Sequence, residues 1–133
     1  MTSCHMRNRT RCEATRSLAN AAQHLRGARD LKLSPRRRYE CAYGAARECA
    51  RALANARNGR SGSDEHNLRE AIDQLLKGLA LAPNIGPSAT AWLQYRREGR
   101  LEAPEPTFEV VKRATSWAAI LHAYAVKQLT MRV

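Results

Sequence analysis

The sequence predicts an all-α fold, an up-and-down helical bundle of four long helices and one short helix. Apolar side chains recur along most of the chain at three- and four-residue spacing, which is the period of an amphipathic helix. Aromatic residues make up only 5% of the chain, and its apolar content rests on Ala and Leu, which favour helices over strands. Helices with one apolar face and short connections pack into bundles.

The first helix is expected over residues 11–29, after a flexible, basic N-terminal arm of residues 1–10 that shows no apolar period. Its apolar stripe consists of Ala14, Leu18, Ala21, Ala22, Leu25 and Ala28. Ser34 and Pro35 predict the start of a second helix, because Ser accepts from first-turn amides and Pro has no amide to satisfy. That helix should run to Asn58 and pack through Tyr39, Ala42, Tyr43, Ala46, Cys49, Ala50 and Leu53.

A Gly- and Ser-rich loop over 58–63 precedes a third helix that Ser63 or Asp64 can cap. Its stripe is Leu68, Ala71, Ile72, Leu75, Leu76 and Leu79, and Pro83, Gly86 and Pro87 end it. Ser88 can cap a short fourth helix around 91–95, before Pro104 and Pro106 break the chain again. The last helix should run from Thr107 to Met131, with the stripe Val110, Val111, Ala114, Trp117, Ala118, Leu121, Tyr124, Ala125 and Leu129.

The length of 133 residues suits a single bundle domain over 11–133. No stretch approaches the roughly 18 apolar residues of a membrane span, and residues 1–11 lack the apolar core of a secretion signal. A cytoplasmic protein without a membrane partner is therefore expected. The four cysteines have neither CxxC spacing nor a His pair at zinc-ligand distance, so we expect reduced thiols, no metal and no cofactor.

The charge of the chain is +11 and is concentrated near the N-terminus. Residues 1–38 carry ten basic and two acidic side chains, a net charge of +8. Such a field attracts nucleic acid, because phosphate neutralisation releases condensed counterions. The candidate nucleic-acid-binding residues are Arg36, Arg37 and Arg38 at the second helix start and Arg96, Arg97 and Arg100 before the last helix. Cations at a helix N-terminus oppose its dipole, which favours a binding role for the first group; the second group also suits a solvated helix end.

Arg60 and His66 are the candidate catalytic residues, and they flank the start of the third helix. An arginine can stabilise the charge of a phosphorane-like transition state while a histidine moves the proton of the 2′-hydroxyl, without a metal. The alternative is a solvent-facing pair at a capped helix start. His24 beside the first apolar stripe, and Tyr39 and Tyr43 at core spacing, are expected to be packing residues rather than a catalytic base or stacking platforms.

The run from Leu33 to Arg47, with Arg38-Tyr39 and then Ala42-Tyr43-Gly44-Ala45-Ala46, resembles bacterial HEPN-domain proteins over about residues 16–130. The resemblance implies a helical bundle, commonly a homodimer, and in many members a ribonuclease toxin paired with an antitoxin. The family's catalytic signature is an Arg with a polar neighbour and a later His or Tyr. It is degenerate before the last helix, where only Arg100 matches, whereas Arg60 and His66 keep the spacing with Ser61 as the polar neighbour.

The sequence therefore predicts an RNA-binding HEPN-like protein, with metal-independent endoribonuclease activity of a toxin-antitoxin or phage-defence system. The alternative is a non-catalytic nucleic-acid-binding subunit or scaffold of a larger ribonucleoprotein complex. DNA binding is ranked third, because the sequence shows no helix-turn-helix spacing that would support it.

Overall fold

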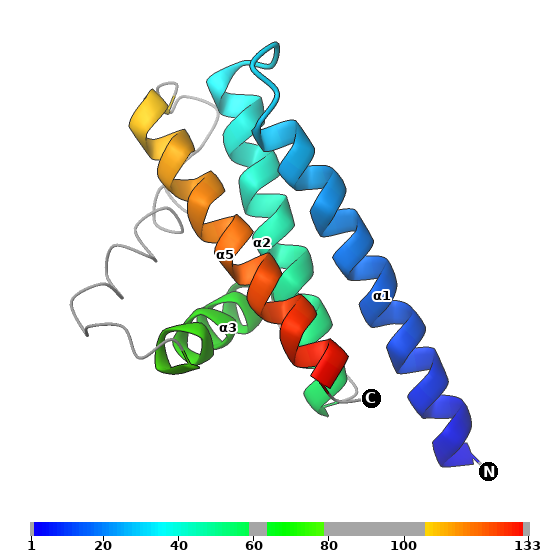
Figure 1. Cartoon of the computed structure of the whole chain (residues 1–133). Coiled ribbons are helices and arrows are strands. Elements are labelled where there is room, and N and C mark those ends of the chain that lie inside the picture. Colours follow the sequence, from blue (N-terminus) through cyan, green and yellow to red (C-terminus); the bar gives the residue numbers. More distant parts are fainter. Residues whose placement is uncertain (1, 59–63, 79–105, 132–133) are drawn as a thin grey trace.

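The computed structural model describes the backbone of residues 2–58, 64–78 and 106–131, and the side chains of 12–56, 66–75 and 106–130. These residues form α1 (Thr2–Ala28), α2 (Pro35–Asn58), α3 (Asp64–Gly78) and α5 (Phe108–Met131), as Figure 1 shows. Within these described ranges there are helices and no strand, which confirms the all-α prediction. The short helix expected after Ser88 lies outside the described residues.

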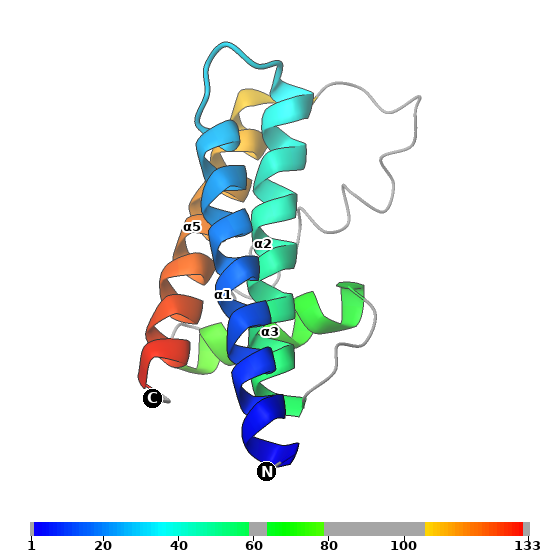
Figure 2. The same cartoon turned by 90° about the vertical axis from the view of Figure 1, so that its right-hand side faces the viewer.

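α2 is the central helix of the bundle and contacts α1, α3 and α5 (Figures 1 and 2). α1 and α2 form an antiparallel hairpin, α3 lies across the C-terminal half of α2, and α5 runs in the same direction as α2. The fourth long helix, α5, thus runs parallel to the second, α2, as an up-and-down order of four long helices requires. The order is broken at α3, which crosses α2 instead of running antiparallel to it.

α1 begins at Thr2, ahead of the start expected at Arg11. The backbone of residues 2–10 is thus part of α1, and the predicted helix start near Arg11 is wrong. The segment from Thr2 to Arg26 contains neither Gly nor Pro, so no residue in it interrupts the helix. An apolar stripe is the sign of a packed helix face, so its absence from this segment did not exclude helical structure.

Capping at the starts of α2 and α5 follows the predicted pattern. The amide of Arg37 donates to Ser34 Oγ at 3.2 Å, and the amide of Arg38 donates to the Ser34 carbonyl at 2.9 Å. At α5 the amide of Val110 donates to Thr107 Oγ1 at 3.2 Å. These bonds satisfy first-turn amides that have no partner within the helix, so the predicted starts of both helices are confirmed.

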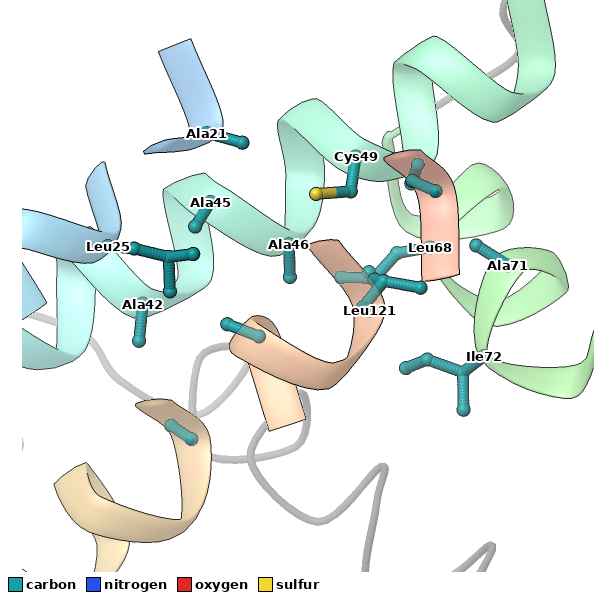
Figure 3. Packing of buried hydrophobic residues seen from close by; sticks show 14 of the residues in the cluster. Ala21, Leu25, Ala42, Ala45, Ala46, Cys49, Leu68, Ala71, Ile72 and Leu121 are labelled. Carbon is teal, nitrogen blue, oxygen red and sulfur yellow. The ribbon is translucent and has the colours of Figure 1, made fainter. Parts of the chain in front are cut away.

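The core lies around α2 (Figure 3). The described residues of the predicted stripes of α1, α3 and α5 contribute to it, and Leu68, Leu75, Val111 and Leu121 are the largest fully buried aliphatic side chains among the described residues. α2 is buried beyond its predicted face, because Ala45, Ala52 and Ala54 are buried as well. Alanine at helix contacts allows close approach, since it places little volume between the two backbones.

Candidate nucleic-acid interface

An open pocket of about 360 Å³ lies between α1 and α2. Its lining consists of His24 from α1 and of Arg37, Glu40, Cys41, Tyr43, Gly44 and Arg47 from α2. The α2 residues recur at three- and four-residue spacing, so they form one stripe along that helix. The pocket is therefore a groove along the α1–α2 hairpin.

Two glycines bring α1 and α2 close together beside the pocket. A Cβ atom at Gly27 would lie 2.6 Å from Cys41 Sγ, and a Cβ atom at Gly44 would lie 3.1 Å from the His24 ring. Each helix thus contributes one glycine that accommodates a side chain of the other. This reciprocal arrangement fixes the position of the His24 ring against α2 at the pocket wall.

The pocket carries two guanidinium groups against one carboxylate. Arg37 is exposed and Arg47 is half-buried, and they lie about 15 Å apart along the axis of α2 at 1.5 Å per residue. The Nε atom of Arg47 is buried and has no hydrogen-bond partner in the part of the chain that the structure describes. An unmet buried donor costs about 1–3 kcal/mol.

The pocket cysteine and the core cysteine are both protonated thiols at neutral pH. Burial raises the pKa of the Cys41 thiol; the Arg37 guanidinium opposes this rise and the Glu40 carboxylate adds to it. Burial, with a smaller effect of the Glu48 carboxylate, raises the pKa of Cys49 to about 12. Because nucleophilic cysteines react as thiolates, neither thiol suits covalent catalysis.

Arg38, one of the predicted nucleic-acid-binding residues, joins three helices. Its Nε donates to the Ala28 carbonyl at the end of α1 at 2.8 Å, and its guanidinium lies 6.0 Å from the centroid of the Phe108 ring. The charge of Arg38 is unfavourable at the N-terminus of α2. The same charge lies beside the C-terminus of α1, where the helix dipole makes a cation favourable. The unfavourable charge at the α2 start therefore has a structural explanation for Arg38. Arg36 is half-buried and Arg37 is exposed.

We expect Arg38→Ala to lower the free energy of unfolding by about 1–2 kcal/mol, because it leaves the Ala28 carbonyl without this charged donor. Arg37→Ala is the matched control: its side chain is exposed and it should change stability by less than about 0.5 kcal/mol. Urea denaturation followed by circular dichroism measures both. Equal effects of the two substitutions would contradict a structural role for Arg38.

Five further site residues were predicted from the sequence, and one of them, His66, is described by the structure. Arg60, Arg96, Arg97 and Arg100 lie outside the described residues. His66 is exposed in the first turns of α3, with its Nε2 atom 3.4 Å from Glu70 Oε2. The Arg60 and His66 pair therefore stays a prediction.

His24, Tyr39 and Tyr43 were predicted to be packing residues, and Gly44 and Arg47 were not predicted as site residues. Tyr39 is buried, at 1% exposure, and the half-buried Tyr43 packs against the core, so both of these predictions are confirmed. Tyr43 and the half-buried His24 also line the pocket. The available signal was the spacing of Arg37, Cys41, Gly44 and Arg47, which places them on one side of the helix. The pocket also depends on how α1 packs against that side of α2, and the spacing does not specify this packing.

The described residues contain no group of three or more His, Cys, Asp or Glu side chains that could hold a metal ion. Across the same residues, no helix has the length and apolarity that a membrane crossing requires. Comparisons of the chain with protein-family models, with curated proteins and with solved structures found no match. The HEPN resemblance thus remains a prediction that rests on the motifs of residues 33–47.

Proposed function

We propose that this chain is a cytoplasmic, HEPN-like RNA-binding protein that contacts the RNA backbone with its α1–α2 hairpin. The observation that carries the proposal is the lining of the hairpin pocket by Arg37 and Arg47, with the buried Nε of Arg47 unpaired among the described residues. Guanidinium groups bind phosphate oxygens through two parallel hydrogen bonds. Other exposed basic side chains on α1 and in its connection to α2 are Arg16, Arg26, Arg29 and Lys32.

The distribution of charge supports the hairpin over the rest of the bundle. The sequence of α3 contains four acidic and two basic side chains. The net negative charge of this helix repels a polyanion. The first 38 residues carry +8 of the total of +11. An approaching RNA is therefore attracted to the α1–α2 side, where the positive potential is concentrated.

The test is fluorescence anisotropy of a labelled RNA, measured over a series of salt concentrations. Each phosphate contact with a single strand adds about −0.7 to the slope of log affinity against log salt, so about five contacts cost a hundredfold between about 50 and 200 mM. We expect a slope of this size. An affinity that hardly changes with salt would refute phosphate binding by this protein.

Two triple variants that remove equal charge locate the interface. We expect the hairpin variant to weaken binding at least about tenfold and to reduce the slope by about 2, and the control variant to leave the slope unchanged. The hairpin variant replaces Arg26, Arg29 and Arg37 with Gln, and the control replaces Lys112, Arg113 and Lys127, which are exposed on α5. Circular dichroism checks that both variants fold. Equal losses in the two variants would mean that net charge, and not the hairpin, determines affinity.

Metal-independent RNA cleavage by Arg60 and His66 is the second candidate function. The proximity of the Glu70 carboxylate to His66 Nε2, at 3.4 Å, favours it, because a carboxylate can orient a histidine that moves a proton. Labelled RNA incubated with the protein in EDTA should shorten on a gel, and the Arg60→Ala, His66→Ala double variant should abolish the shortening. A mobility shift without shortening would support the non-catalytic alternative, a binding subunit of a ribonucleoprotein. A homodimer and an antitoxin partner are further expectations of the HEPN resemblance, and light scattering tests the first.

A further inference from the structure

We infer that the α1–α2 pocket holds one unpaired base of a single-stranded RNA, with phosphates on either side of that base at Arg37 and Arg47. The inference rests on the proposed RNA binding and names the form of RNA that the site takes. Three features of the pocket carry it: its size, the separation of its two guanidinium groups and the rings between them.

The size of the pocket suits part of a nucleotide. Its volume of about 360 Å³ is near the lower end of the range of about 300–1,000 Å³ that is usual for small-molecule sites. A duplex cannot place a base in such a pocket, because its bases are paired and stacked inside the helix. Proteins read RNA bases mainly in single strands, where unstacked bases can turn outward.

Arg37 and Arg47 are ten residues apart on α2, which separates their positions by about 15 Å along the helix axis. This exceeds the spacing of adjacent phosphates in one strand, so the two arginines suit phosphates on either side of the groove that are not adjacent in the strand. At one end lies the half-buried Arg47, whose buried Nε has no hydrogen-bond partner among the described residues. At the other end, Arg37 is exposed and accessible from solvent.

The middle of the groove favours a flat, uncharged group. The aromatic rings of His24 and Tyr43 line it, and bases stack on such rings. The Cys41 thiol is neutral, and the Glu40 carboxylate disfavours a phosphate between the two arginines. A carboxylate also accepts hydrogen bonds from the exocyclic amino groups of bases. The groove thus has an arginine at each end and two aromatic residues between them.

The experiment compares a short labelled single-stranded RNA with a duplex of the same sequence, by fluorescence anisotropy at fixed salt. We expect the wild-type protein to bind the single strand at least about tenfold more tightly, which is the usual effect of stacking one base. Arg47→Gln should reduce the salt slope for the single strand by about 0.7, whereas Arg113→Gln on α5 should not change it.

Tyr43 and a matched tyrosine separate stacking from a loss of stability. Tyr43→Leu should weaken single-strand binding about tenfold or more and leave duplex binding unchanged, and Tyr43→Phe should retain the affinity. Tyr124→Leu is the control, because Tyr124 is likewise half-buried against the core but lies on α5, away from the pocket.

The outcomes distinguish this inference from the function on which it rests. A preference for the single strand that Tyr43→Leu removes, and Tyr124→Leu does not, supports the inference. Salt-sensitive binding with equal affinity for single strand and duplex, unaffected by the Tyr43 and Arg47 substitutions, overturns it and leaves RNA binding by the hairpin intact. The absence of salt-sensitive binding to either RNA overturns both.

Discussion

We expect Leu121→Ala to lower the free energy of unfolding by about 2–5 kcal/mol, the range observed when a buried leucine is truncated to alanine. Leu121 is 1% exposed, and in Figure 3 its side chain lies beside that of Leu68 from α3. Truncation would remove apolar contacts where α5 meets the rest of the core and leave a cavity. Because domains of this size are stable by only about 5–15 kcal/mol, the variant should be close to unfolding under mild denaturant.

The adjacent residue provides the control. Ile120→Ala deletes the same number of carbon atoms on the same helix, but Ile120 is 41% exposed. We expect it to cost less than about 1 kcal/mol, because its side chain is only partly removed from water. Urea denaturation of the two variants measures the difference. Similar losses would mean that α5 does not pack through the side that carries Leu121.

The parts of the fold that could be predicted from the sequence are those determined by neighbouring residues. Ser34 with Pro35, and Thr107, act on the amides of the next turn, so the starts of α2 and α5 follow from local chemistry. The apolar stripes of α1, α3 and α5 were predicted for the same reason, since the helical period is a local property. Leu68 and Val111 are buried as their positions in these stripes predicted.

The central position of α2 could not be predicted in this way. Alanine is common on exposed and on buried helix faces, so the sequence does not distinguish Ala45 and Ala52, which are buried, from an alanine in solvent. Burial of these residues depends on how α1, α3 and α5 are placed around α2. The crossing of α3 over α2 likewise depends on how distant segments pack together.

The candidate site shows the same limit. The basic residues were found from composition, yet the contact of Arg38 with the Ala28 carbonyl joins residues from two helices and depends on the hairpin register. That register is visible in the close contacts of Gly27 with Cys41 and of Gly44 with His24. The sequence located the basic residues of the hairpin. It could not predict that Arg38 contacts the end of α1 or that His24 lines the pocket.

The small residues of α2 lead to a second large effect on stability. We expect Ala46→Leu to lower the free energy of unfolding by up to about 3 kcal/mol, because added carbon atoms in a packed core force neighbouring side chains or helices to move. Ala46 is fully buried and points toward α5 in Figure 3. Leucine is nearly as good a helix former as alanine, so helix propensity does not account for such a loss.

Ala123→Leu on α5 makes the same chemical change at an exposed position and should leave stability within about 0.5 kcal/mol of the wild type. If Ala46→Leu were equally neutral in urea denaturation, α2 would have free space beside α5 and would not be the central helix of a close-packed bundle. A loss confined to Ala46→Leu would instead show that α2 and α5 approach too closely for a larger side chain. In that case, alanine at this position is required by the packing of the bundle and is more than a helix-forming residue.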